Sequence, residues 1–358
     1  MKIKKHLRSL LNKEITLNEK QTIPAYLVAI FVFVLCLALV LFSPRLFRLE
    51  RGETGPQELK GERIYTENDA VVIAPQTAIY SQPDHREERL SSLIFDELVH
   101  ILDKSPGKYW KIQTEDGVIG YVASLDLSSD TSVVEPNLAY YKAIVQGREK
   151  RLFSHARRGE LLAIVPMGTV LYADYRSPDL LRVKLVDGQF AWVSTADLLI
   201  AEAQADFDIP KDEAKSRFLS SLMAFHGAPR LPGQMTVEGT DLIGAVRIAA
   251  RLNGIELPRR LSELSQRGER IELRHDPETG LVDLSVLEPG DLIFLRDPTD
   301  GETLYDLACV MEDQIVLMNQ RNSSTLGLWD LNSDEETQKK MAFAIRLPEL
   351  QDTAEEGK

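Results

Sequence analysis

The stretch that decides the fold of the C-terminal part of this chain is EGTDLIGAV, residues 238–246. It opens an apolar pattern with helical spacing, which predicts a helix over residues 241–253, ended by Gly254. Apolar residues at three- and four-residue intervals predict an earlier helix over residues 211–225. Apolar runs predict strands at residues 291–295, 307–311, 314–318 and 341–346. Helices followed by strands predict an α+β domain over residues 211–349.

Two upstream segments, residues 69–128 and 137–200, repeat one order of short strands. The first closes with DGVIGYV at residues 116–122, and the second closes with DGQFAWV at residues 187–193. Asp-Gly favours a tight turn between strands, and the repeat predicts two similar all-β barrels. Both segments resemble bacterial SH3-type modules, which often end in Asp-Gly, a spacer and Gly-Trp-Val, with Tyr121 in place of the first Trp. The alternative is any small barrel of five or six strands, which needs no ligand.

The N-terminal part contains an uncharged apolar run at residues 24–43. A run of about 20 such residues matches the length of a transmembrane helix. Six Lys and Arg against two Glu precede it, so the positive-inside rule places residues 1–23 in the cytoplasm and the later domains outside. The sequence therefore predicts a single-pass protein of the inner membrane, with a linker at residues 44–68 and a disordered acidic tail at residues 350–358. The alternative is a cleaved signal peptide, but VLFSP at residues 40–44 is a poor cleavage site.

Composition excludes several classes of function. The formal net charge of -13 argues against nucleic-acid binding, because phosphate recognition requires a basic face. The two cysteines, Cys36 and Cys309, are too far apart in the predicted organisation to pair. No spacing of His, Cys or Asp predicts a metal site, and no cofactor is expected.

Four segments in order resemble the NlpC-type peptidases, which cut bacterial wall peptides. They are GAP at residues 227–229, GTDLIG at residues 239–244, RLNGIELPR at residues 251–259 and LEPGDLIF at residues 287–294. Together with the two SH3-type modules, the arrangement is similar to the γ-D-glutamyl-L-diamino-acid endopeptidase branch, dipeptidyl-peptidase VI-like. The resemblance covers roughly residues 70–347 and implies a papain-like α+β fold for the C-terminal domain.

The family mechanism requires a cysteine at a helix N-terminus, a histidine base and a third polar group. At the matched positions the chain carries other residues: Leu242 for the cysteine, Ile243 for the adjacent serine, Asp306 for the base, Met318 or the neighbouring Asn319 for the third group, and Arg230 for a tyrosine. Leucine cannot ionise or attack a carbonyl carbon. The resemblance therefore implies a peptidase fold in which the catalytic residues have been replaced.

Other groups could replace the missing chemistry. Cys309 lies three residues beyond Asp306 on the same predicted strand, so alternation places it on the opposite face, as a core residue. His226 and His275 are the histidines of this domain, and a loop or surface position is the simpler interpretation of both. Asp241 and Asp306 could form a carboxylate pair, although a structural role for each is the simpler alternative.

The sequence supports two main functional hypotheses. The first is a membrane-anchored, non-catalytic homologue that binds peptidoglycan stem peptides or an envelope protein complex. Its predicted binding groove consists of Arg230, Asp241, Leu242, Ile243, Asp306 and Tyr121. The second is a divergent endopeptidase that cuts the same peptides. A weaker third alternative is an accessory subunit whose groove binds nothing.

Overall fold

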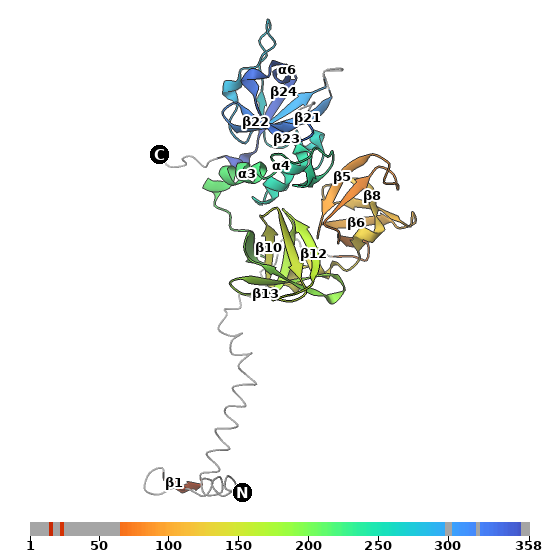
Figure 1. Ribbon diagram of the computed structural model, residues 1–358, viewed down its shortest axis with the longest axis vertical. Coiled ribbons are helices and arrows are strands. Elements are labelled where there is room, and N and C mark those ends of the chain that lie inside the picture. The colour runs from red at the N-terminus through yellow and green to blue at the C-terminus, as the bar shows by residue number, and fades with distance from the viewer. Residues whose placement is uncertain (1–13, 17–21, 25–64, 298–302, 320–322, 352–358) are drawn as a thin grey trace. The chain divides into compact units, whose positions relative to one another are not determined.

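The structure is a computed structural model that describes residues 14–16, 22–24, 65–297, 303–319 and 323–351. The chain divides into two compact units, Met1–Ile64 and Tyr65–Lys358. In the first unit, β1 (Glu14–Thr16) pairs antiparallel with β2 (Thr22–Pro24). The second unit contains two β modules and a C-terminal module of helices and a sheet (Figure 1).

The predicted fold class is wrong in its transmembrane helix. No helix within the described ranges is long and apolar enough to cross a membrane. Pro24, the first residue of the predicted span, lies in a strand in register with Glu14. The uncharged run meets the length requirement of a span, but pairing with a neighbouring strand holds the backbone at its start extended rather than helical. Residues 25–43 of the predicted span lie outside the described residues.

The first β module contains seven antiparallel strands in the order β5-β4-β8-β7-β6-β3-β9. Their bounds are β3 (Asp69–Val72), β4 (Gln76–Tyr80), β5 (Arg89–Ile94), β6 (Leu98–Asp103), β7 (Tyr109–Thr114), β8 (Ile119–Ala123) and β9 (Leu127–Ser128). Alternate residues of β4 are buried, as expected for a strand with one face in a core. Asp116 and Gly117 form the turn between β7 and β8, where Gly117 adopts a φ of 81°.

The second β module repeats this arrangement, in the order β12-β11-β15-β14-β13-β10-β16. Its strands are β10 (Tyr141–Val145), β11 (Glu149–Phe153), β12 (Leu161–Pro166), β13 (Val170–Arg176), β14 (Leu180–Lys184), β15 (Phe190–Ser194) and β16 (Leu198–Glu202). Replacing β3 to β9 by β10 to β16 in turn converts the first order into the second. The internal repeat in the sequence is therefore a repeat of topology.

The C-terminal module contains two helices of ten residues and a six-stranded antiparallel sheet in the order β19-β24-β20-β21-β22-β23. Its helices are α3 (Ala214–Met223), α4 (Leu242–Arg251), α5 (Leu261–Leu264) and α6 (Glu335–Gln338). Its strands are β17 (Met235–Thr236), β18 (Gly239–Thr240), β19 (Glu269–Glu272), β20 (Leu292–Arg296), β21 (Leu304–Glu312), β22 (Ile315–Asn319), β23 (Leu326–Asp330) and β24 (Met341–Arg346).

Short 3₁₀ helices occur in the loops of all three modules: Ser124–Asp126, Thr131–Val134, Pro136–Leu138, Val186–Gly188, Lys211–Glu213, Leu284–Val286, Leu331–Ser333 and Pro348–Leu350.

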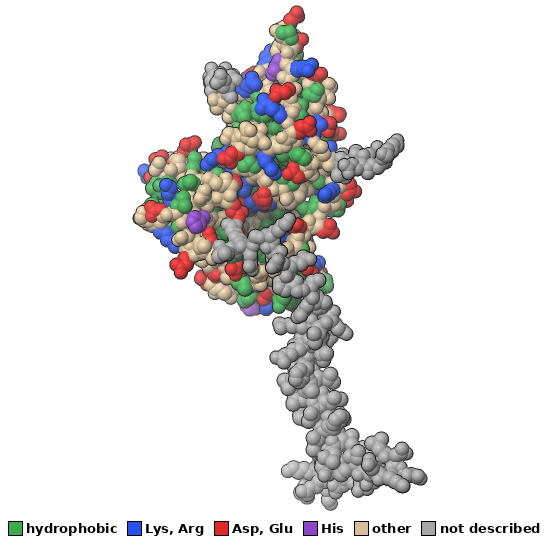
Figure 2. Space-filling model, turned by 180° about the vertical axis from the view of Figure 1, so that it is seen from behind, with side chains coloured by type: hydrophobic (Ala, Val, Ile, Leu, Met, Phe, Trp, Pro, Cys, Tyr) green, Lys and Arg blue, Asp and Glu red, His purple; other side chains and the backbone are tan. Residues whose placement is uncertain are grey.

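The main core of the C-terminal module lies between the helices and the sheet. Phe218 and Leu222 of α3 and Ile248 of α4 belong to the same buried cluster as Phe294 and Leu317 of the sheet. Helix α4 is buried on nearly all sides, which its small residues make possible. Acidic and basic side chains are interspersed over the described surface seen in Figure 2.

Candidate functional site

The N-terminus of α4 is the position at which the sequence predicts the former nucleophile. Asp241 is the N-cap residue, and its Oδ1 accepts a hydrogen bond from the Gly244 N–H at 2.8 Å. Its Oδ2 accepts from the Gly233 N–H at 2.7 Å, which ties the preceding loop to the helix. Burial raises the pKa of the Asp241 carboxyl above its ordinary value. Both carboxylate oxygens therefore serve to hold the backbone in place.

Leu242 is the first residue of α4, and its side chain is 1% exposed. It belongs to the buried cluster that also contains Leu307 and Leu317 of the sheet, and Ile243 packs against that cluster. At Gly244, an added Cβ would meet the backbone oxygen of Gln234. The helix N-terminus is therefore closely packed and presents an apolar residue to the core.

Asp306 and Arg230 come together beside this helix end. The Arg230 Nη2 lies 3.5 Å from the Asp306 Oδ2, and the Asp306 Oδ1 accepts a hydrogen bond from the Leu307 N–H. The Arg230 N–H donates to the Ser324 carbonyl oxygen, which fixes the loop that carries it. Burial, with a smaller contribution from the charge of Asp241, outweighs the Leu307 N–H and Arg230 and raises the pKa of Asp306 to about 6.

The two candidates for the former third position are both buried. Met318 is 3% exposed and belongs to an apolar cluster with Ala308 and Val310. Asn319, the last residue of β22, is also 3% exposed. Within the described part of the chain, neither its side-chain oxygen nor its side-chain nitrogen has a hydrogen-bond partner. Asn319 is thus a buried polar group without a hydrogen-bond partner among the described residues, and its assignment to the third position stays a prediction.

Cys309 is fully buried in the core, as predicted, and burial raises the pKa of its thiol. His226 is exposed. The ring nitrogens of His275 lie 3.1 Å from the Gly280 carbonyl oxygen and 2.8 Å from the Met341 carbonyl oxygen, so the ring holds a turn against β24. Among the described residues, no group of three or more His, Cys, Asp and Glu could hold a metal ion.

Tyr121 lies in β8, in register with Tyr80 of β4, and its side chain is half-buried. No hydrogen bond or ion pair of the described residues joins Tyr121 to Arg230, Asp241 or Asp306. The structure therefore brings together the charged residues of the predicted groove, Arg230, Asp241 and Asp306, while Tyr121 stays with the first β module.

A cluster of buried charges, not predicted from the sequence, connects the first β module to α4. Glu97, in the turn before β6, pairs with Arg251 at 2.6 Å, Arg259 at 2.8 Å and Arg247 at 3.7 Å. Asp116 pairs with Arg259 at 2.7 Å. Burial raises the pKa of Glu97, but the three guanidinium groups more than offset this effect and hold it far below its ordinary value.

We call Glu97, Asp116, Arg247, Arg251 and Arg259 the arginine–carboxylate cluster. The pKa values of its arginine side chains are also shifted. Burial, and then the charge of Arg259, lowers the pKa of Arg247 to about 10, so the guanidinium is still charged at neutral pH. A signal for the cluster existed in the sequence, because all three arginines lie within residues 247–259. Their acidic partners are more than 130 residues away, so only the tertiary structure identifies them.

No protein-family model and no curated protein sequence match this chain. Solved structures do match it. The chain is similar to an NlpC/P60 family protein from Bacillus cereus ATCC 10987, with a TM-score of 0.65 and 18% identity over 78% of this chain and 99% of that chain. The chain has an NlpC/P60 fold. It is also similar to an NlpC/P60 endopeptidase from Photobacterium damselae subsp. piscicida, with a TM-score of 0.51 and 12% identity over 79% of this chain and 67% of that chain.

The similarity to the Bacillus cereus protein covers 78% of the chain, which is more than the C-terminal module alone. The SH3-type nature of the β modules stays a prediction, as do the predicted domain limits and the location outside the cytoplasm.

Proposed function

We propose that this protein is a non-catalytic member of the NlpC type that binds peptidoglycan stem peptides or an envelope protein partner. One observation carries the proposal: the first residue of α4 is a leucine that is 1% exposed and packed into the core. Nucleophilic catalysis at a helix N-terminus requires an ionisable, accessible group there. Leu242 supplies neither property.

The surrounding groups support the same proposal. Cys309, the cysteine of the described part of the chain, is fully buried, and its thiol resists ionisation. Asp241 uses both carboxylate oxygens to accept backbone hydrogen bonds, which gives it a structural role at the start of α4. Asp306 is paired with Arg230. The polar residues beside the groove therefore serve binding and structure rather than proton transfer to a nucleophile.

The alternative function is a divergent endopeptidase. The raised pKa of Asp306, about 6, is the observation that favours it, because a carboxyl group that titrates near neutrality can act as an acid or a base. This alternative requires a nucleophile, such as a water molecule held by Asp306, in place of a side chain. It predicts turnover that is lost in Asp306→Asn.

The deciding experiment incubates the purified full chain with muropeptides that contain a γ-D-glutamyl-diamino-acid bond, and follows cleavage by mass spectrometry. We expect no cleavage and measurable binding. Robust turnover by the unmodified protein, abolished by Asp306→Asn, would establish the alternative. Restoring the family residues with Leu242→Cys and Asp306→His tests whether the groove still accepts substrate, with Leu242→Cys alone as the matched control.

Binding is tested separately by calorimetry with the same muropeptides. Arg230→Gln removes the groove cation and is expected to weaken binding, whereas Arg274→Gln removes the same charge from an exposed position outside the groove and should have no effect. If no muropeptide binds, the partner is sought by cross-linking in intact cells, with the same two variants compared. Loss of one cross-linked protein in Arg230→Gln alone would identify an envelope partner.

A further inference from the structure

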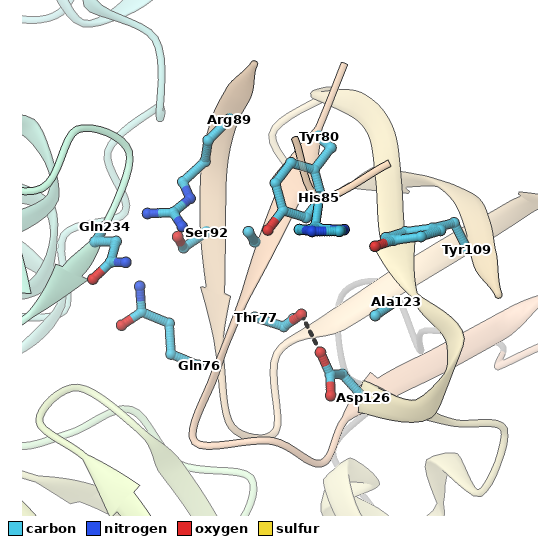
Figure 3. A pocket seen from close by; sticks show the side chains of 11 residues that line it. Gln76, Thr77, Tyr80, His85, Arg89, Ser92, Tyr109, Ala123, Asp126 and Gln234 are labelled. Carbon is cyan, nitrogen blue, oxygen red and sulfur yellow. Dashed lines mark hydrogen bonds between the residues drawn. The ribbon is translucent and has the colours of Figure 1, made fainter. Parts of the chain in front are cut away.

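A second candidate site lies in a polar cavity of about 450 Å³, a volume that suits a small ligand. Strands β4, β5 and β7 of the first β module supply most of its lining, and the loop before β17 supplies Gln234. Figure 3 shows side chains from these separate elements pointing toward one space: Gln76, Tyr80, His85, Arg89, Tyr109 and Gln234.

Arg89 is a charged group of this cavity that has no ion-pair partner among the described residues. No acidic side chain of the described residues forms an ion pair with it, and its Nε is buried without a hydrogen-bond partner. Its stem packs against Gly233, where an added Cβ would lie 3.2 Å from the Arg89 Cγ and Cδ. A guanidinium group stays protonated in proteins, so a partly buried and unpaired one favours an anion within reach.

The acidic and basic neighbours of Arg89 are already satisfied. Asp126 accepts a hydrogen bond from the Thr77 hydroxyl at 2.6 Å, the dashed line in Figure 3. The His85 Nδ1 lies 3.3 Å from Asp84. The Ser92 hydroxyl donates to the Gly233 carbonyl oxygen. The lining carries one positive charge at Arg89 and one negative charge at Asp126, which lie apart in Figure 3, so the end of the cavity at Arg89 is the end that offers a positive charge to an anion.

The remaining polar groups add donors and two aromatic rings. The side-chain amides of Gln76 and Gln234 lie beside the Arg89 guanidinium in Figure 3. The rings of Tyr80 and Tyr109 meet edge to face, with centroids 6.1 Å apart and an interplanar angle of 85°. Tyrosine rings present an apolar face with a polar tip. Such a site suits a ligand with an anionic end and a short carbon chain.

We propose that this cavity binds a carboxylate group, held by Arg89 through two parallel N–H···O hydrogen bonds and flanked by Gln76 and Gln234. Planar guanidinium and carboxylate groups match in geometry, and one unpaired cation balances a monoanion better than a phosphate dianion. The carbon chain of the ligand lies against Tyr80 and Tyr109. The inference goes beyond the proposed function, because it requires no property of the α4 N-terminus.

The test measures binding of small probes to the full chain by calorimetry. The probes are acetyl-Ala-Ala in both configurations, its uncharged C-terminal amide, and lactate. We expect the free carboxylate to bind at least about ten times more tightly than the amide, because hydrogen bonds to a charged group contribute about 1.5–3 kcal/mol and 1.4 kcal/mol corresponds to tenfold. Preference for acetyl-Ala-Ala indicates a peptide terminus as the natural source, and preference for lactate indicates a hydroxy-acid group.

Two substitutions locate the site. Arg89→Gln is expected to weaken carboxylate binding by about tenfold or more, while Arg86→Gln removes a charge from an exposed position outside the cavity and should leave it unchanged. If circular dichroism shows that Arg89→Gln is unfolded, Gln234→Ala tests the same site from the neighbouring module. Equal affinity for the carboxylate and the amide, tighter binding of inorganic phosphate, or unchanged binding in a folded Arg89→Gln variant would each overturn the inference.

Discussion

Glu97→Gln is the substitution that most directly tests how the first β module is fixed to the C-terminal module. Glu97 is 10% exposed and lies among Arg251, Arg259 and Arg247, whose side chains are 12%, 4% and 5% exposed. Glutamine preserves the shape but removes the charge. Of the two carboxylates in the arginine–carboxylate cluster, only Asp116 would then remain to neutralise three guanidinium groups.

The expected loss of folding stability in Glu97→Gln follows from the burial of the Glu97 carboxylate. Removing one partner from a buried ion pair costs about 3–5 kcal/mol, because it leaves an uncompensated buried charge. The contact at 2.6 Å and the low exposure place Glu97 in this class rather than among surface pairs. Glu256 provides the matched control, since it pairs with the same Arg251 at 3.4 Å but is 69% exposed. Glu256→Gln should cost less than about 1 kcal/mol.

The assay is chemical denaturation of the full chain, followed by circular dichroism at several pH values. The folded-state pKa of Glu97 is depressed, so its stabilisation is present above the ordinary pKa of 4.5 and is lost as the pH falls below that value. The difference between wild type and Glu97→Gln should therefore shrink in acid. If Glu97→Gln lowers the free energy of unfolding at pH 7 by no more than Glu256→Gln does, Glu97 does not stabilise the fold through the arginine–carboxylate cluster.

Two further predictions concern the groove. Asp306→Asn should stabilise the protein at pH 7 by about 2–3 kcal/mol: a pKa raised from 3.8 to about 6 corresponds to about 3 kcal/mol, less up to about 1 kcal/mol for the lost Arg230 pair. Because this pKa is raised, wild-type stability should fall as the pH rises from about 4 to 6, and denaturation curves in which Asp306→Asn keeps that slope would contradict the assignment. Gly244→Ala should destabilise by about 1–3 kcal/mol, since its Cβ would meet the Gln234 carbonyl oxygen, whereas a thermal melt showing the stabilisation usual for Gly→Ala in a helix would disprove this close contact.

Local patterns predicted much of the C-terminal module. The helix predicted over residues 241–253 corresponds to α4 (Leu242–Arg251), and the strand predicted over residues 291–295 corresponds to β20 (Leu292–Arg296). Edge strands were missed: β19 (Glu269–Glu272) is largely exposed, so it carries no apolar alternation. In the β modules, the sequence gives no clear signal for β5 (Arg89–Ile94), because Ser91 and Ser92 at its centre interrupt the apolar alternation.

The sequence alone determined the order of the modules, the internal repeat and the apolar residue at the start of α4, because these depend on residue type and local spacing. Tertiary structure decided that Asp241 caps the helix with both oxygens and that Asp306 lies beside Arg230. It also decided the pairing of Glu97 with Arg251 and Arg259, more than 150 residues away, and the convergence of Arg89 and Gln234 on one cavity. These contacts join segments distant along the chain, and their energies depend on burial, which no local pattern records.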